Sequence, residues 1–264
     1  MFVLGSLITP GVSREPDMGS LTGRVALITG ASRGIGRAIA SMLAEEGVRL
    51  GLASRSGDDL GIDGGLGIEC DVRDRVAVER AVASTVGRFG GLDILVVNAG
   101  VGAYGPFLDL DLEHLEEMID VNVKGAIYAV RAALPHLLES DAADFVMIAS
   151  EAGRRGLPYE AVYCASKFAQ VGLTAALDHE LRERGVRCTN ICPGGVATDF
   201  AMGRGRTPDM PQLSGMMRPE DVAEAVRFVV TRPRTHRIPC SRSSWSSARV
   251  SPTWPNFDAQ YTAS

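Results

Sequence analysis

The sequence has no long run of positive charge. Its 264 residues carry a net charge of −5, with 27 Lys and Arg against 32 Asp and Glu. A nucleic-acid-binding surface needs clustered Lys and Arg, so we expect no nucleic-acid partner. The composition is otherwise ordinary, 45% hydrophobic and 22% charged, which argues against a wholly disordered chain.

The five cysteines include no Cys-x-x-Cys pair, and their number is odd. An odd number cannot complete an intramolecular disulfide framework, so free thiols in a reducing cytoplasm are the simpler interpretation. Cys188 and Cys192 form a Cys-x-x-x-Cys pair, but no His stands close to them in the sequence. We therefore predict no metal site.

Long hydrophobic runs are also missing, because no stretch approaches the ~20 apolar residues of a membrane span. The first twenty residues lack a basic segment and meet Pro10 and Gly11 early, unlike a secretory signal. We expect a cytoplasmic protein without a membrane partner. Residues 1–20 are expected to be a flexible extension, and either Met1 or Met18 is the true start.

Apolar segments typical of strands alternate with segments of helical periodicity. Strands are expected at 24–30, 48–54, 67–72, 92–100, 143–150 and 186–194, and helices at 34–47, 73–88, 111–139, 160–184 and 219–230. The helix at 111–139 is expected to break, if anywhere, before Pro135. This alternation predicts an α/β fold: a Rossmann-type doubly wound parallel sheet of six to seven strands with helices on both faces.

We assign residues 21–238 to one domain, because no linker or repeat interrupts the alternation. Residues 56–67 are short and rich in Gly and Asp, and we expect a loop there. Residues 239–264 are rich in Ser and Pro and lack periodicity, so we expect an atypical, irregular tail. A seventh strand is hinted at only by Thr-His-Arg-Ile at 235–238.

A glycine-rich segment links the first strand to the first helix. A glycine can make the tight turn, let the backbone approach a ligand, and let the helix pack on the strand. The helix N-terminus offers free N–H groups to a pyrophosphate. The spacing is Gly-x-x-x-Gly-x-Gly, and a glycine-rich turn without a ligand is the alternative. The candidate cofactor-binding residues here are Gly30, Ser32, Arg33, Gly34, Ile35 and Gly36.

The end of the second strand bears on which cofactor is bound. An acidic residue there would bind the ribose of NAD, whereas an arginine can accept the 2′-phosphate of NADP. Here Ser54 is neutral, and Arg55 and Arg33 are available, which favours NADP(H) over NAD(H). Both arginines could instead be merely solvated, and Asp58 and Asp59 keep NAD possible.

Six motifs in order resemble those of the short-chain dehydrogenase/reductase family. They are TGASRGIG (29–36), NAG (98–100), Asn122 in DVNVKG, Ser150 in MIAS, YCASK (163–167) and PGGVATD (193–199). The match looks like the single-domain, Tyr-x-x-x-Lys branch of the family and covers about residues 22–231. The resemblance implies catalysis by Asn122, Ser150, Tyr163 and Lys167.

Elementary chemistry supports these roles. A phenol can give or take the proton of a carbonyl–alcohol interconversion, but its ordinary pKa is about 10. An ammonium group and a positive nicotinamide can lower it, and positions i and i+4 place Tyr163 and Lys167 on one helix face. Ser150 closes a strand at its carboxyl end and can bond the substrate oxygen. In the family, the Asn helps to hold a water linked to the lysine.

Each of these residues also has a structural alternative. Ser150 could cap a helix or loop, Asn122 could mark a local kink, and Tyr163 could be a core aromatic. The resemblance assigns further cofactor contacts to Asp71, Val72, Asn98, Gly100, Tyr163, Lys167, Pro193, Gly194, Val196 and Thr198. Each of those outside the catalytic set could instead be a turn residue.

The family resemblance also implies a homodimer or homotetramer formed through the helices at about 111–139 and 160–184. The helix at 160–184 carries small residues at Ala165, Ala169, Gly172 and Ala176. The segment at about 195–217 contains several methionines, which suggests an apolar, adaptable lid over the substrate.

The sequence therefore predicts an NADP(H)-dependent oxidoreductase acting on a ketone or secondary alcohol, with residues 21–238 as its NAD(P)-binding Rossmann oxidoreductase domain. The alternatives are a non-catalytic dinucleotide-binding or sensor protein, or a C-terminally altered enzyme with impaired assembly. The specific substrate does not follow from the sequence.

Overall fold

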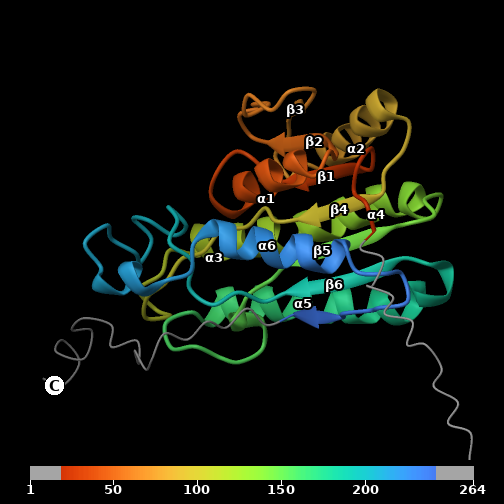
Figure 1. Ribbon diagram of the computed structural model, residues 1–264. Coiled ribbons are helices and arrows are strands. Elements are labelled where there is room, and N and C mark those ends of the chain that lie inside the picture. The colour runs from red at the N-terminus through yellow and green to blue at the C-terminus, as the bar shows by residue number, and fades with distance from the viewer. Residues whose placement is uncertain (1–18, 242–264) are drawn as a thin grey trace, which may run out of the picture.

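The computed structural model describes residues 19–241, which fold around one parallel sheet (Figure 1). The strands are β1 (Val25–Thr29), β2 (Arg49–Ser54), β3 (Leu66–Glu69), β4 (Ile94–Val97), β5 (Asp144–Ile148), β6 (Arg187–Ile191) and β7 (Cys240–Ser241). Their order is β3-β2-β1-β4-β5-β6-β7, and every neighbouring pair is parallel. The predicted α/β fold is confirmed.

Helices cover both faces of the sheet. They are α1 (Gly34–Glu45), α2 (Arg75–Phe89), α3 (Leu112–Ile119), α4 (Ala126–Leu137), α5 (Ala161–Leu181) and α6 (Pro219–Val230). Side chains of β1 alternate between the two layers: Val25 and Leu27 pack with α2 and α4, and Ala26 and Ile28 pack with α1 and α6. This alternation is the period-2 pattern of a strand buried on both faces.

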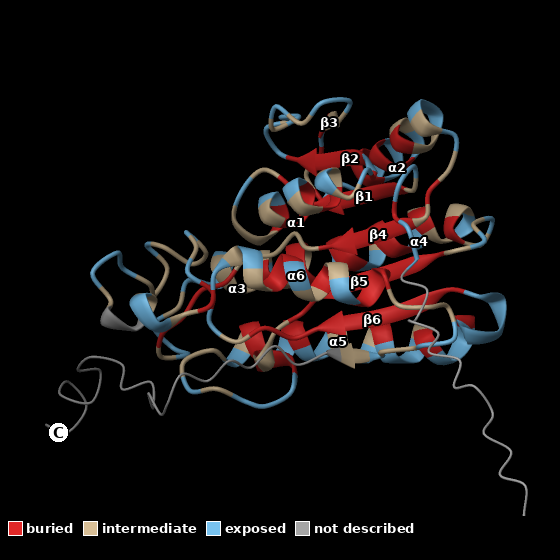
Figure 2. Cartoon of the chain, in the orientation of Figure 1, coloured by how far each residue is buried: buried red, intermediate tan, exposed pale blue. Residues whose placement is uncertain are grey.

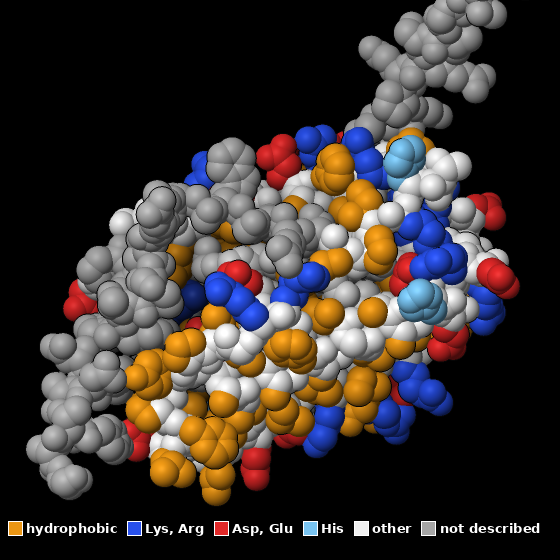
Figure 3. All heavy atoms as spheres, turned by 90° about the horizontal axis from the view of Figure 1, so that it is seen from below, with side chains coloured by type: hydrophobic (Ala, Val, Ile, Leu, Met, Phe, Trp, Pro, Cys, Tyr) orange, Lys and Arg blue, Asp and Glu red, His pale blue; other side chains and the backbone are white. Residues whose placement is uncertain are grey.

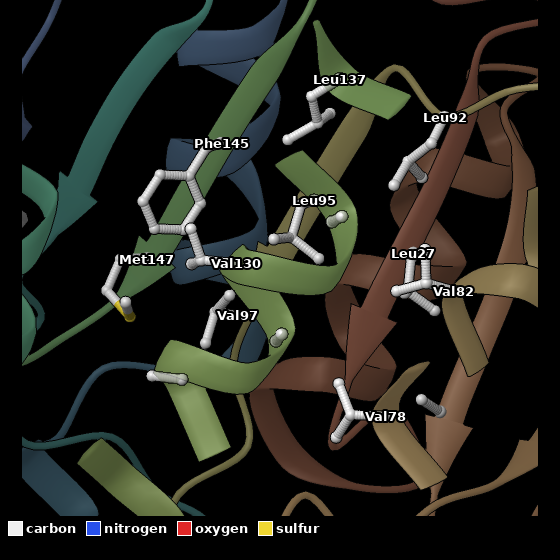
Figure 4. Packing of buried hydrophobic residues seen from close by; sticks show 14 of the residues in the cluster. Leu27, Val78, Val82, Leu92, Leu95, Val97, Val130, Leu137, Phe145 and Met147 are labelled. Carbon is white, nitrogen blue, oxygen red and sulfur yellow. The ribbon is translucent and has the colours of Figure 1, made fainter. Parts of the chain in front are cut away.

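The strands form the buried centre of the molecule (Figure 2). On one face, Phe145 and Met147 of β5 and Leu95 of β4 meet Val130 of α4, and Leu27 of β1 meets Val82 of α2 (Figure 4). The strand order reverses at β1, which has β2 on one side and β4 on the other. In doubly wound sheets the ligand lies beyond the carboxyl ends of the strands at this switch point.

Two expectations about local structure were wrong. The segment at 111–139 is not one helix broken before Pro135, because α3 and α4 are joined by a π-helical stretch, η1 (Asp120–Gly125), and Pro135 lies inside α4. The seventh strand is β7 rather than residues 235–238, which form no strand. Other element boundaries differ from the expected ones by a few residues.

The two terminal segments fall largely on residues that the structure does not describe. Residues 1–18 of the expected extension and 242–264 of the expected tail lie outside the described range. The assignment of residues 21–238 to one oxidoreductase domain stays a prediction. No helix within residues 19–241 is long and apolar enough to cross a bilayer.

Candidate active site

A single cavity of about 770 Å³ runs along the carboxyl ends of the strands. Every cofactor-binding residue expected from the sequence lines this cavity, including Gly30 and Gly34 of the glycine loop, Thr198 beside Gly34, and Tyr163. Of the four expected catalytic residues, Ser150, Tyr163 and Lys167 line it as well, and Asn122 does not.

The glycine loop is shaped by close contacts. Gly30 has a positive φ of 67°, and a Cβ there would lie 2.8 Å from the Cα of Ala99. A Cβ on Gly36 would overlap the carbonyl oxygen of Gly30, so the start of α1 packs directly on the turn after β1. Arg33, Gly34 and Ile35, at the start of α1, line the cavity, so this helix N-terminus lies where a pyrophosphate could bind.

Asn98 joins the ends of β1 and β4. Its Nδ2 donates to the carbonyl oxygens of Thr29 and Gly30, both at 3.0 Å, and the Thr29 hydroxyl accepts from the backbone N–H groups of Asn98 and Ala99. These bonds hold the two strand ends that flank the switch point. The Asn98 side chain thus shapes the turn at Gly30, while its residue still lines the cavity.

The adenosine end of the cavity carries exposed cations. Arg33 and Arg55 are exposed lining residues, and neither side chain forms an ion pair with another described residue. Ser54 is buried, and its hydroxyl accepts from the backbone N–H of Gly57 at 3.1 Å. Asp58 and Asp59 do not line the cavity.

Asp71 has a cation of its own. Arg73 binds its carboxylate at 2.6 Å, and this hydrogen bond is the main reason that the Asp71 pKa lies below its usual value. Arg55 lowers that pKa further through its charge. Beside Asp71, Val72 is buried and lines the same wall. A charged Asp71 can accept hydrogen bonds from an adenine or ribose group.

Ser150 serves two neighbours at once. Its hydroxyl accepts from the Ala152 N–H at 3.1 Å, which caps the short 3₁₀ helix η2 (Glu151–Gly153), and it also hydrogen-bonds Tyr163. The structural alternative and the catalytic expectation for Ser150 are therefore compatible. The bond to Tyr163 lowers the Tyr163 pKa, although burial is the larger effect and raises that pKa to about 12.

Lys167 lies one helical turn after Tyr163, with Nζ 5.7 Å from the centroid of the Tyr163 ring. It is 3% exposed, and burial lowers its pKa to about 7. Its Nζ donates to the Ile148 carbonyl at 3.1 Å and to Oε1 of Gln170 at 2.9 Å. The protein alone therefore favours a neutral phenol and weakens the charge on the lysine.

Asn122 is fully buried in η1 and acts at a distance from the cavity. Its Oδ1 accepts from the Val101 N–H, and its Nδ2 donates to the Val101 carbonyl and to the Ser166 hydroxyl. Its backbone carbonyl accepts from Gln170 at 2.7 Å. Asn122 therefore ties the loop after β4 to α5 and positions the catalytic helix.

The other half of the cavity holds residues that the sequence interpretation missed. Tyr104 and Phe200 pack against the Tyr163 ring, with centroids 5.5 and 5.7 Å away. The Arg206 guanidinium lies over the Tyr104 ring at 5.7 Å. Glu160 lines the same region, and burial raises its pKa to about 7. Met210 and Met216 of the expected lid also line the cavity.

Few sequence signals pointed to these residues. Glu160 directly precedes the helix of Tyr163, and Arg206 lies among the methionines of the expected lid, but neither position has a distinctive spacing. Gln170 was detectable, because a polar residue three positions after Lys167 shares its buried helix face. The described residues contain no group of three or more His, Cys, Asp or Glu that could hold a metal.

Comparison with known proteins gives consistent matches. The family model described as short chain dehydrogenase matches residues 24–209. Oxidoreductase UcpA of Salmonella typhimurium is 41% identical over 206 residues, covering 74% of this chain and 78% of that protein. The residues that the family model matches include strands β1 to β6 and most of the cavity lining.

Solved structures resemble the fold closely. An alcohol dehydrogenase from Thermococcus sibiricus, complexed with 5-hydroxy-NADP, has a TM-score of 0.76 and 32% identity, covering 86% of this chain and 98% of that chain. A carveol dehydrogenase from Mycobacterium avium, in complex with NAD, has the same TM-score and 28% identity, covering 85% and 97%. The solved structures that resemble this chain thus include one with an NADP derivative and one with NAD.

Proposed function

The chain belongs to the short-chain dehydrogenase/reductase family of NAD(P)-dependent oxidoreductases, and we propose that it transfers hydride between NADP(H) and a ketone or secondary alcohol. One observation carries the proposal. The glycine loop and the Ser150–Tyr163–Lys167 group line the same cavity, so a dinucleotide held at one end reaches the proton-transfer group at the other.

The residues present fit such a cofactor. Gly30 and Gly36 let the turn after β1 pack closely on Ala99 and on the start of α1, which lines the cavity where the pyrophosphate would bind. Pro193, Gly194, Val196 and Thr198 also line the cavity and would border the nicotinamide. When bound, the nicotinamide supplies the hydride for reduction or accepts it in oxidation. Lys167 would bind the ribose next to it, because its ammonium lines the cavity.

Tyr163 is the proposed general acid and base. In reduction, the substrate carbon gains the hydride and its oxygen takes the proton from Tyr163 Oη; oxidation of the alcohol returns both. Ser150 would hydrogen-bond the same substrate oxygen and stabilise its developing charge. Since burial favours the neutral phenol, the protein by itself prepares Tyr163 as a proton donor.

The preference for NADP(H) is supported by the cations at the adenosine end. Arg33 and Arg55 are exposed beside Ser54, and a 2′-phosphate needs such donors. NAD binding would need a carboxylate after β2 that reaches the ribose hydroxyls. The nearest carboxylates after β2 in the sequence, Asp58 and Asp59, do not line the cavity.

The substrate end favours a molecule with an apolar body. Tyr104, Leu157, Phe200, Met210 and Met216 line it, and Glu160 and Arg206 add two polar groups. Methionine side chains adapt to different shapes, so the segment at about 195–217 is proposed as a lid that closes over the substrate.

We also propose a homodimer or homotetramer that assembles through α4 and α5. The outer face of α5 exposes Ala165, Phe168, Ala169 and Gly172, and hydrophobic side chains gather on this face in the view from below (Figure 3). Ile127 of α4 is 42% exposed. With five free cysteines among the described residues, a reducing cytoplasm is the proposed location.

The decisive experiment is a panel of ketones and secondary alcohols, followed by the absorbance of NADPH and NADH. Turnover with at least one carbonyl compound, faster with NADPH, is expected. Thermal unfolding with each dinucleotide gives an independent readout, because binding to the folded state raises the midpoint. Dinucleotide binding without turnover of any carbonyl compound would argue instead for a binding protein.

A further inference from the structure

Four polar side chains follow one another along the buried face of α5. Tyr163, Lys167, Gln170 and Thr174 are 7%, 3%, 1% and 0% exposed. Their spacing places them on one side of the helix. The proposed reaction uses the first two and leaves Gln170 without a task. Because an amide is costly to bury unless its donor and acceptor both find partners, this glutamine must bond to specific groups.

Gln170 makes one bond with each end of its amide. Its Nε2 donates to the Asn122 carbonyl at 2.7 Å, and its Oε1 accepts from Lys167 Nζ at 2.9 Å. The reverse orientation would set an NH₂ group against the ammonium and an oxygen against the carbonyl. Only one orientation of the amide therefore satisfies both contacts.

These contacts determine how Lys167 presents its charge. The ammonium has three N–H donors, and two of them bond Ile148 O and Gln170 Oε1. Two fixed acceptors stop rotation about the Cε–Nζ bond and so set the direction of the third N–H. Lys167 lines the cavity, so that third donor would be available to a bound cofactor.

The second bond of Gln170 reaches a different part of the chain. Asn122 lies in η1, where π-helical geometry departs from regular α-helical hydrogen bonding. The link from Lys167 to the Asn122 carbonyl, which in the family involves a water, is made here by the Gln170 amide. An amide carries a hydrogen-bonded link without itself taking up or losing a proton at neutral pH.

We propose that Gln170 is a positioning residue, which orients the Lys167 ammonium toward the cavity, favours its charged form and ties it to the Asn122 turn. The claim about turnover rests on the proposed oxidoreductase function. The claim about the lysine does not, because it concerns the protein alone.

The surroundings of Lys167 make this contribution measurable. Burial lowers the Lys167 pKa to about 7, and the nearby Cys192 at the end of β6 acts in the opposite direction. Tyr163 is the titratable neighbour on α5, while β5 and η1 contribute the carbonyls of Ile148 and Asn122, which do not titrate. A neutral acceptor at Oε1 favours the charged amine without adding a charge to the site.

The test uses the fact that Lys124 and Lys167 are the only two lysines in the sequence. Protein labelled with ¹³C in the lysine side chains gives two ε-carbon signals, and exposed Lys124 is the internal reference. Gln170→Met removes the acceptor at similar volume, and we expect the Lys167 midpoint to fall by about half a pH unit or more. Gln170→Glu adds a carboxylate, and we expect the midpoint to rise by at least as much.

Thr174→Val is the matched control. It alters the same buried face one turn further on, where the Thr174 hydroxyl donates only to the Gln170 carbonyl, and it should leave the Lys167 midpoint unchanged. Unchanged Lys167 midpoints in the Gln170 variants, or a mere loss of thermal stability, would overturn the proposal. If Gln170→Met does not fold, the proposal is decided by whether the Lys167 midpoint rises in Gln170→Glu.

Steady-state kinetics then test the claim that Gln170 contributes to turnover. Both Gln170 variants should lower kcat about tenfold or more, because Gln170→Met favours the uncharged lysine and Gln170→Glu offsets the lysine charge with a carboxylate. Both should move the acid limb of alcohol oxidation to higher pH, and the KM for the dinucleotide should change much less than kcat, because Lys167 itself remains to bind the ribose. Wild-type activity and a wild-type pH profile in both variants would overturn the claim about turnover. If wild-type protein turns over no carbonyl compound, the proposed function fails, while the lysine titration still decides the role of Gln170.

Discussion

Tyr163 and Lys167 lie one turn apart on α5, and burial drives both toward their neutral forms. It raises the Tyr163 pKa to about 12 and lowers the Lys167 pKa to about 7. The Ser150 hydrogen bond opposes the first effect. Since the same desolvation acts on both groups, a charge-separated phenolate–ammonium pair needs further positive charge in the cleft.

Replacement of the proposed general acid gives the first prediction. Tyr163→Phe removes the hydroxyl but keeps the ring that packs against Tyr104 and Phe200. We expect kcat to fall by about 10² to 10⁴ and the dinucleotide Kd to stay within about threefold. Steady-state kinetics and a binding titration measure the two effects. Tyr128→Phe, which changes a tyrosine outside the cavity lining, is the control, and full activity in Tyr163→Phe would refute the assignment.

The second prediction follows from the lowered pKa of Lys167. The unfolded chain holds this proton up to about pH 10.5, whereas the folded protein releases it near pH 7. Between these values the unfolded state binds more protons, so the stability of the folded protein rises with pH. Relative to Lys167→Met, the free energy of unfolding of the wild type should grow by about 1 kcal/mol per pH unit in this window.

Urea unfolding at about pH 7.5 and about pH 9 measures this difference. Lys124→Met is the control, because Lys124 is exposed and its pKa is raised by its bond to Asp120, so it titrates above the window. A wild-type advantage that shrinks as pH rises would contradict the lowered Lys167 pKa.

The third prediction concerns the choice of dinucleotide. Arg33→Ala and Arg55→Ala should each raise the KM for NADPH about fivefold or more and leave the KM for NADH nearly unchanged, because only NADPH carries the 2′-phosphate. The effect should weaken with added salt, since both side chains are exposed. Arg37→Ala removes an equal charge from α1 outside this cavity and is the control. Equal losses with NADPH and NADH would speak against a phosphate contact.

Much of the fold followed from local pattern. Continuous apolar strands between helical segments predicted the parallel sheet, and the motifs at strand ends predicted which residues line the cavity. Residues such as Gly30 and Thr198 are located by position, because the carboxyl ends of parallel strands meet at one edge. Side-chain periodicity did not reveal η1, since a π-helical turn changes backbone hydrogen bonds with little change in which faces are apolar.

The missed residues depend on contacts between distant segments. Tyr104 follows β4 and packs against Phe200, which follows β6. Because the two residues are far apart in the sequence, no local motif predicts that either belongs to the site. Burial likewise sets the pKa of Tyr163 in a way that spacing does not reveal. Positions i and i+4 place the lysine near the phenol, but the sign of the shift in the protein alone comes from desolvation.

The fourth prediction uses two charges of opposite sign at the substrate end. The Glu160 carboxylate raises the pKa of Tyr163, and Arg206 lowers it. In alcohol oxidation, Glu160→Gln should therefore move the acid limb of kcat/KM to lower pH, and Arg206→Met should move it to higher pH, each by about half a unit. A shift of both variants in the same direction would show that changes in substrate binding dominate.

The last prediction tests assembly through the outer face of α5. Phe168 is 47% exposed between Ala165 and Gly172, and an apolar surface of small residues with one large side chain suits close packing against a second copy. We expect wild-type protein to sediment as a dimer or tetramer at micromolar concentration. Phe168→Glu should shift it toward the monomer, because an unpaired carboxylate in an apolar interface is strongly unfavourable. Val76→Glu adds the same charge at an exposed position on α2 and should leave the assembly unchanged. A monomeric wild type, or equal dissociation in both variants, would rule out this interface.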